Sequence, residues 1–226
     1  MFYVNLKYLK RKVFTVDKMS VIVPCFNEED VLPLFYQEVT KVLESIENTT
    51  YELLFINDGS SDHTEDLIKL MAHKNKQCFY YSFSRNFGKE AAMYAGLENA
   101  TGDYVVIMDA DLQHPPYLLK EMYHSLKEEN YDCCAGKRID RTGEGKLRNF
   151  LSHSFYKVIQ TLTKMDMDDG AGDFRMMTRQ MVDAILELKE YNRYMKGLFS
   201  FVGFNTKWLE FHNVERQGGK TKWSFK

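Results

Sequence analysis

Two aspartates separated by one residue, Asp109 and Asp111, follow the apolar run Val105–Met108. An apolar run rich in β-branched residues predicts a buried strand. Because residues two apart in an extended chain share a face, we expect both carboxylates and the amide of Gln113 to project together. Carboxylate, amide, water and phosphate oxygens are the ligands that Mg²⁺ or Mn²⁺ prefers. The spacing therefore predicts a divalent-metal site, and an aspartate pair that only caps the next helix is the alternative.

Basic residues in two stretches could bind phosphate groups. Arg85 and Lys89 precede a predicted helix, whose first backbone N–H groups favour anions. Residues 136–148 are basic and contain glycine, so their guanidinium groups suit phosphate oxygens. Solvated side chains in an ordinary exposed loop are the alternative in both stretches.

Acidic residues stand at two further predicted turns. Asp58 ends a predicted strand, a position suited to binding a base or a ribose, and an Asx turn is the equal alternative. Farther on, residues 168–175 combine Gly170 and Gly172 with Asp173 and Arg175, which predicts a tight turn near a ligand. A simple acidic turn is the alternative there.

The elements that must position these residues alternate between strand and helix patterns. We expect strands at residues 20–24, 51–57, 79–83, 105–108 and 132–136, and helices at 31–46, around 67–71, at 90–99 and at 117–129. Strands that alternate with helices predict a mostly parallel sheet flanked by helices. We therefore expect one Rossmann-like α/β domain over residues 19–205, with the polar turns along one edge of the sheet.

The overall composition is that of an ordinary globular domain, with 44% hydrophobic and 27% charged residues. A net charge of −2 gives no reason to expect nucleic-acid binding. No run of 18 apolar residues predicts a transmembrane segment, and no signal peptide is expected. The four cysteines lack metal-ligand spacing, so we expect reduced core thiols in a cytosolic protein.

Both ends of the chain combine basic and aromatic residues. Residues 1–18 hold five Lys or Arg against one Asp, and 206–226 hold five against two Glu. Trp208 and Trp223 lie in the second segment. This composition predicts an N-terminal arm and a C-terminal segment that favour an anionic membrane surface, with solvated tails as the alternative.

Six motifs together resemble the inverting GT-A glycosyltransferases, specifically the polyprenyl-phosphate glycosyltransferases related to dolichol-phosphate mannose synthase. The matching motifs are Val21–Pro24 with Asn27 and Glu28, Asn57–Asp62, Ser84–Lys89, Asp109–Gln113, Gly172–Arg175 and Arg216–Lys220. They follow the family's order over about nine-tenths of the chain. The resemblance implies a GT-A fold, a nucleotide-diphosphate sugar, Mg²⁺ or Mn²⁺, and a polyprenyl phosphate such as undecaprenyl or dolichyl phosphate.

The resemblance also implies a role for individual residues. It assigns nucleotide-sugar binding to Pro24, Asn27, Glu28, Asp58, Lys89, Asp109 and Ala110. It assigns the metal to Asp109, Asp111 and Gln113, and the acceptor phosphate to Arg138, Arg148 and Ser152. It places Asp111, Asp173 and Arg175 at the reaction centre. A UDP-linked donor, UDP-glucose or UDP-N-acetylglucosamine, is favoured over GDP-mannose.

The implied reaction is a single displacement that inverts the anomeric carbon at the cytoplasmic face of a membrane. Relatives of this kind usually continue into transmembrane helices, so we expect either a truncated chain or a peripheral form. Two alternatives stay open: a GT-A transferase acting on a saccharide or protein hydroxyl, and a non-catalytic nucleotide-sugar binding module. No G-x-G-x-x-G follows the first strand, which argues against dinucleotide binding. The formation of a homo-oligomer is left open.

Overall fold

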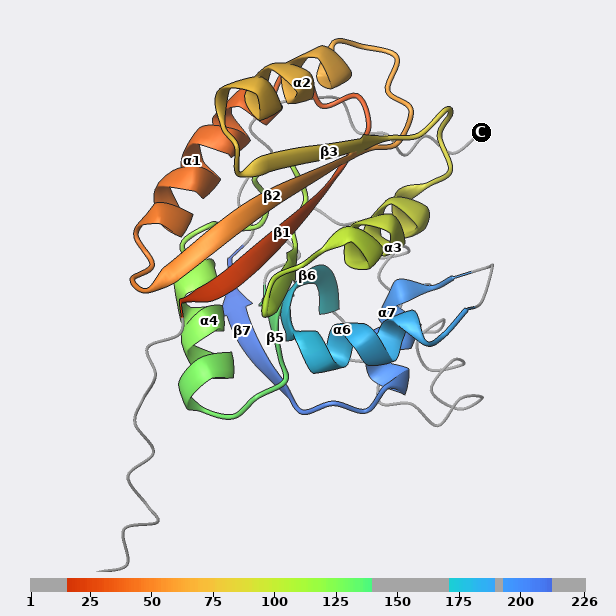
Figure 1. Ribbon diagram of the computed structural model, residues 1–226. Helices are drawn as coiled ribbons and strands as arrows, with labels where there is room; N and C mark the ends of the chain where they lie inside the picture. The colour runs from red at the N-terminus through yellow and green to blue at the C-terminus, as the bar shows by residue number, and fades with distance from the viewer. Residues whose placement is uncertain (1–15, 140–170, 190–192, 213–226) are drawn as a thin grey trace, which may run out of the picture.

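A seven-stranded sheet lies between two layers of helices in the computed structural model, which describes residues 16–139, 171–189 and 193–212 (Figure 1). The strands are β1 (Asp17–Cys25), β2 (Thr49–Asn57), β3 (Cys78–Ser82), β4 (Tyr104–Ile107), β5 (Cys133–Arg138), β6 (Ala171–Thr178) and β7 (Thr206–Phe211). The helices are α1 (Leu32–Glu44), α2 (Thr64–Lys74), α3 (Lys89–Asn99), α4 (Leu118–Glu128), α6 (Arg179–Leu186) and α7 (Met195–Phe201). Helices α1, α2 and α4 cover one face of the sheet, and α3, α6 and α7 cover the other.

The strand order is β3-β2-β1-β4-β6-β5-β7. Strands β1, β2, β3 and β4 pair in parallel, as do β5 and β7, whereas β6 runs antiparallel to both of its neighbours. The chain first builds outward from β1 to β3 and then returns to place β4 on the other side of β1. This reversal of direction is a switch point, and open α/β sheets bind ligands outside the carboxyl ends of the strands there.

The reversed direction of β6 brings two distant segments together at this edge. Ile107 in β4 pairs with Arg175 in β6, so the residues that follow β4 lie opposite the residues that begin β6. Asp109 and Asp173 therefore meet at the carboxyl edge of the sheet, although one follows its strand and the other lies near the start of its own.

Alternating side chains divide the core between the two faces. Val21 and Val23 of β1 pack against the layer of α1, α2 and α4, and Ile22 packs against the layer of α3. Helix α3 approaches β1 closely, because a Cβ added at Gly96 would lie 2.2 Å from Cγ2 of Ile22. This close approach holds α3 against the sheet, and Lys89 is the first residue of that helix.

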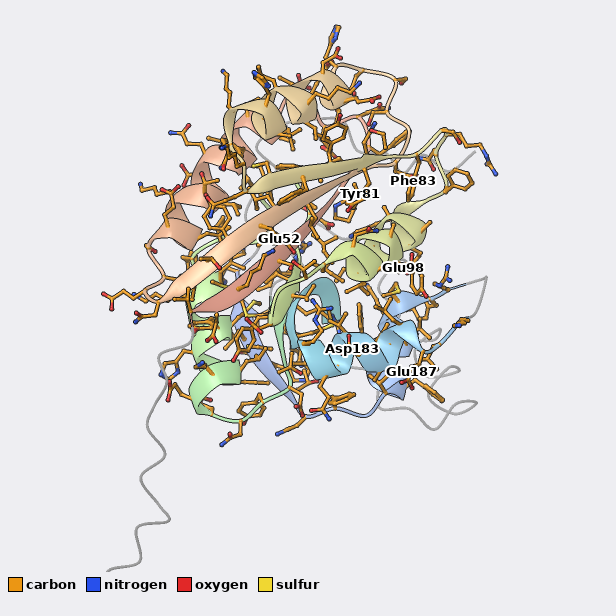
Figure 2. All side chains as sticks on the ribbon, viewed as in Figure 1. Glu52, Tyr81, Phe83, Glu98, Asp183 and Glu187 are labelled. Atoms are coloured by element: carbon orange, nitrogen blue, oxygen red, sulfur yellow. The ribbon has the colours of Figure 1, made fainter. Side chains whose placement is uncertain are left out.

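A buried carboxylate holds the opposite edge of the sheet. Glu52 of β2, labelled in Figure 2, accepts hydrogen bonds from the Ser20 hydroxyl at 2.6 Å and the Thr101 backbone N–H at 2.8 Å, and it pairs with Lys18. Burial raises the pKa of Glu52, but these hydrogen bonds and the Lys18 charge lower it below its ordinary value. The network ties β1, β2 and the turn before β4 together.

The expected α/β class and mostly parallel sheet are confirmed, and the expected strands and helices lie within a few residues of those observed. All four cysteines are buried free thiols. Among the helices that the structure describes, none combines the length and apolarity needed to span a bilayer.

Two expectations were wrong. The segment Gly172–Arg175 is part of β6 and not a tight turn, because Phe174 and Met176 alternate into the core. Thr206–Phe211 is a strand of the sheet and Trp208 packs against a core cluster, so the expected boundary between the domain and the C-terminal segment at residue 206 falls inside the domain. Strand β1 also begins at Asp17, before the expected start of the domain.

Candidate active site

The loops after β1 and β2 are joined by hydrogen bonds. Asn27, with a left-handed φ of 55°, accepts a 2.8 Å hydrogen bond on its side-chain oxygen from the Ser61 backbone N–H. Its own backbone N–H donates to the Ser60 hydroxyl at 3.0 Å, and that of Glu28 donates to the Thr64 hydroxyl at 2.8 Å. The loop that carries Asn27 and Glu28 is thus fixed at the carboxyl edge, while their contact with a nucleotide stays a prediction.

Asp58 fixes a third loop, the turn between β3 and α3. It is 3% exposed, and its two carboxylate oxygens accept the backbone N–H groups of Phe87 at 2.7 Å and Gly88 at 3.0 Å. The next residue, Gly59, has a φ of +67°, and a Cβ there would lie 2.4 Å from the backbone carbon of Arg85. Asp58 therefore positions the turn that precedes Lys89, and its expected contact with a base or ribose stays a prediction.

Lys89 lies between two carboxylates at the switch point. Its Nζ is 2.7 Å from Oδ1 of Asp109 and 2.7 Å from Oδ2 of Asp173. The side chains of Lys89, Asp109 and Asp173 are 41%, 28% and 14% exposed. Burial lowers the pKa of Lys89, but the two carboxylates raise it above its ordinary value, so the ammonium stays charged. Burial raises the pKa of Asp109, and the Lys89 charge brings it below its usual range.

The chain turns sharply after Asp109, so the expected sharing of one strand face was wrong. Strand β4 ends at Ile107, and Leu112 has a left-handed φ of 57°. Asp111 is partly exposed and accepts the Gln113 backbone N–H at 3.1 Å. Both aspartates still follow β4 at the same edge, but a turn and not an extended strand positions them.

The oxygen ligands at this edge fit a hard cation, although they do not enclose one. Across residues 16–139, 171–189 and 193–212, no three His, Cys, Asp or Glu side chains form a metal-holding group. Oδ1 of Asp173 is buried and has no hydrogen-bond partner in the described part of the chain. A cation held by Asp109, Asp111 and Gln113 would therefore need further oxygens, such as those of a donor diphosphate.

His114 supports Asp109 and is not placed as a metal ligand. It is 6% exposed, stacks on Phe174 with ring centroids 4.9 Å apart, and accepts the Asp109 backbone N–H on Nδ1 at 3.3 Å. Burial lowers the pKa of His114, the Asp109 charge raises it, and the charges of Lys89 and Arg138 lower it further. His114 is thus held as a neutral acceptor behind the aspartates.

Arg175 lies beneath α7 and makes its contacts within the protein. It is 4% exposed, donates from Nη2 to the Gly172 carbonyl at 2.9 Å, and its Cζ lies 3.8 Å from the centroid of the Phe199 ring. Burial lowers its pKa from the ordinary value. Its predicted place at the reaction centre is untested, and these contacts assign it at least a role in holding α7.

Two charged residues near Lys89 and its two carboxylates, Glu90 and Lys196, were not predicted from the sequence. Glu90 accepts the Met195 backbone N–H at 2.8 Å and so joins the start of α3 to the start of α7. Burial raises the pKa of Glu90 above its usual value. The charge of Lys196 helps lower the pKa of Asp109. The adjacency of Glu90 to Lys89 was the one available signal, because no motif surrounds Lys196.

The remaining predicted residues fall into two groups. Pro24 is the last but one residue of β1, Ala110 is buried between the two aspartates, and Arg138 ends β5. Arg148 and Ser152 lie outside the described residues, as do residues 1–15 of the N-terminal arm and the tail after residue 212. Their predicted roles are therefore untested.

Comparisons with known proteins place this chain among the glycosyltransferases. Residues 20–186 match the family model described as glycosyl transferase family 2. The chain is 46% identical over 207 residues to the putative glycosyltransferase CsbB of Bacillus subtilis, covering 92% of this chain and 62% of that protein. It is 38% identical over 211 residues to the prophage bactoprenol glucosyl transferase homolog of Escherichia coli, covering 92% and 67%. The chain thus spans about two-thirds of the length of these relatives, and the second name confirms the resemblance to polyprenol-linked transferases.

Solved structures share the fold at low sequence identity. A mannosyltransferase from Pyrobaculum calidifontis, in complex with GDP-Man and Mn²⁺, has a TM-score of 0.61 at 18% identity, covering 88% of this chain and 57% of that one. Glucosyl-3-phosphoglycerate synthase from Mycobacterium tuberculosis, with Mn²⁺, UDP-glucose and phosphoglyceric acid, has a TM-score of 0.58 at 18% identity, covering 90% and 73%. Both neighbours support the GT-A architecture.

Proposed function

This chain belongs to glycosyl transferase family 2, and on that premise we propose that it transfers a hexose from a UDP-sugar to a polyprenyl phosphate. The observation that carries the proposal is the meeting of Lys89, Asp109 and Asp173 at the switch point. An ammonium and two carboxylates there can hold a sugar diphosphate and orient its hexose. UDP-glucose is our first choice of donor, because the Escherichia coli relative is named a glucosyl transferase.

In the proposed mechanism, the three loops at the carboxyl edge hold the donor. The fixed loop of Asn27 and Glu28 binds the nucleoside, with Pro24 and the Asp58-anchored turn beside it. Lys89 and the N-terminal N–H groups of α3 face the diphosphate. A bound Mg²⁺ or Mn²⁺ at Asp109, Asp111 and Gln113 supplies further charge neutralisation on the leaving diphosphate.

The acceptor is already an anion near neutral pH, so the proposed displacement needs no strong general base. Arg138, together with Arg148 and Ser152, binds the acceptor phosphate and aligns one oxygen with the anomeric carbon. Oδ1 of Asp173, which has no partner among the described residues, accepts a hydrogen bond from a hydroxyl of the donor hexose in this mechanism. Direct attack inverts the anomeric carbon, and catalysis comes from positioning and charge stabilisation.

A polyprenyl phosphate places this chemistry at a membrane surface, and we propose the cytoplasmic face, where nucleotide sugars are made. The basic and aromatic residues within 1–15 and 213–226, beyond strands β1 and β7, support peripheral attachment to anionic lipid.

Release of the nucleoside diphosphate, UDP or GDP according to the donor, separates this function from its alternatives. UDP-glucose, UDP-N-acetylglucosamine and GDP-mannose are each incubated with the protein and Mn²⁺, alone, with undecaprenyl phosphate, or with a panel of saccharides and peptides. The proposal expects release that depends on the lipid phosphate. Release that depends on a saccharide or peptide hydroxyl favours the second enzyme class, and binding without release favours a non-catalytic module.

A further inference from the structure

Both oxygens of the Asp109 carboxylate are occupied by one ammonium group. Nζ of Lys89 lies 2.7 Å from Oδ1 and 2.8 Å from Oδ2 of Asp109, and it also contacts Asp173. A divalent cation that uses Asp109 as a ligand meets the positive charge of this ammonium at the same carboxylate, and the two cations repel each other. Metal and lysine therefore compete for the same carboxylate.

The structure leaves Lys89 free to move away. Its side chain is 41% exposed, and it begins α3 directly after Gly88. Among the residues that the structure describes, none has an atom within 4 Å of a Cβ added at Gly88, so these residues leave space beside the turn. A flexible lysine chain at a helix start can swing from Asp109 toward a diphosphate bound at the N-terminus of α3 without repacking the core.

We propose that Lys89 is an exchangeable internal cation: it neutralises Asp109 and Asp173 while the site is empty, and moves to the donor diphosphate when a divalent cation takes Asp109. This inference rests on the proposed function. It makes Lys89 a positioning residue that couples the binding of metal to the binding of nucleotide. Without nucleotide, the metal must bind an Asp109 carboxylate that is already paired with Lys89. When the donor diphosphate binds, the Lys89 ammonium pairs with it instead, and Asp109 becomes available to the metal.

The exchange predicts two effects of opposite sign when the ammonium is removed. Lys89→Met should bind Mn²⁺ more tightly than wild type in the absence of nucleotide, because nothing competes for Asp109. The same variant should bind UDP more weakly in EDTA, because the diphosphate loses its cation. A lysine that stays on the two carboxylates would leave UDP binding in EDTA unchanged when it is removed, because it would never contact the diphosphate, although Mn²⁺ would still bind more tightly.

The experiment measures Mn²⁺ affinity by the loss of the free-ion paramagnetic resonance signal, and UDP affinity in EDTA by calorimetry. We expect Lys89→Met to tighten Mn²⁺ at least about fivefold and to weaken UDP at least about fivefold, the lower end of measured couplings between sites. Lys89→Arg keeps the charge and should leave Mn²⁺ binding as weak as in wild type. Lys207→Met, which removes a lysine paired with Glu129 at 2.7 Å elsewhere, should change neither affinity.

Circular dichroism establishes that each variant is folded, and Lys89→Gln takes the place of Lys89→Met if the latter is not. Unchanged or weaker Mn²⁺ binding in the uncharged variant, while wild type binds Mn²⁺ with UDP, would overturn the exchange and leave glycosyl transfer standing. Absence of Mn²⁺ binding by wild type even with saturating UDP would overturn the proposed metal site, and the exchange with it.

Discussion

Lys89 and Asp173 are 84 residues apart in the sequence, yet Nζ and Oδ2 lie 2.7 Å apart. The contact exists because β6 runs antiparallel to β4, which places its first residues at the carboxyl edge of the parallel strands. The reversed strand thus supplies an acid that a purely parallel sheet would place at the far edge. Asp173 has one oxygen on Lys89 and a second, buried oxygen without a partner among the described residues.

The unpartnered oxygen predicts a catalytic loss for Asp173→Asn. The substitution keeps one hydrogen-bonding oxygen but removes the charge that pairs with Lys89, so we expect kcat with UDP-glucose and undecaprenyl phosphate to fall about a hundredfold. Steady-state UDP release measures it. Asp183→Asn, on an exposed part of α6, is the control and should leave kcat unchanged. Equal rates in the two variants would remove Asp173 from the reaction centre.

Substitutions at Arg138 and Asp58 should affect different substrates, the acceptor and the donor respectively. Arg138→Ala should raise KM for the lipid phosphate by about tenfold or more, because a charge-assisted hydrogen bond contributes roughly 1.5–3 kcal/mol. Asp58→Ala releases the turn before Lys89 and should mainly weaken UDP binding. Calorimetry with UDP and acceptor titrations measure both. Lost UDP affinity with a normal acceptor KM in Arg138→Ala would show that we have misassigned it.

Two glycines with positive φ, Gly59 and Gly88, allow a controlled comparison of how an added methyl group changes the free energy of unfolding. Gly59→Ala brings a Cβ within 2.4 Å of the Arg85 backbone, whereas Gly88→Ala has open space and only the conformational strain. We expect Gly88→Ala to lower the free energy of unfolding by about 1 kcal/mol and Gly59→Ala by at least about 2 kcal/mol more. Urea denaturation compares them. Equal losses would mean that the turn shifts freely to admit the methyl group.

The contact between Glu90 and Met195 predicts how α7 is held. Glu90→Ala removes the acceptor for the Met195 N–H, so amide hydrogens of Met195–Phe201 should exchange faster. Glu90→Gln keeps an acceptor oxygen and should retain most of the protection. Hydrogen exchange followed by mass spectrometry measures the difference, and equal protection in both variants would show that other contacts hold α7.

Glu52 predicts an acid-sensitive part of the stability. Its pKa is lower in the folded chain than its ordinary value, so the stabilisation is fully present above the unfolded-state pKa, near 4.5, and is lost as the pH falls through the lower folded-state pKa. Glu52→Gln should be less stable than wild type at neutral pH, and the gap should narrow in acid. Urea melts at several pH values measure it, and a constant gap would contradict the assignment.

Local patterns predicted the parallel half of the fold, because β1, β2 and β4 are apolar runs that end in polar turns. They did not predict β6, since its Gly172 and Asp173 read as turn residues and its burial depends on pairing with β4 and β5. The same distinction between local pattern and long-range packing applies to the residues of the site. Asp109 and Lys89 were identified from their positions after a strand and before a helix, whereas Glu90 and Lys196 gain their places from the packing of α7, which no spacing reveals.

The most direct measurement asks for the product itself. The protein is incubated with UDP-glucose, Mn²⁺ and undecaprenyl phosphate in detergent, and the lipid is extracted and weighed by mass spectrometry, with Asp111→Asn in parallel. Our account predicts a lipid phosphate that carries one hexose, formed with stoichiometric UDP and reduced at least about a hundredfold in the variant. An unmodified lipid, while the same protein releases UDP with a saccharide or peptide acceptor, would contradict it.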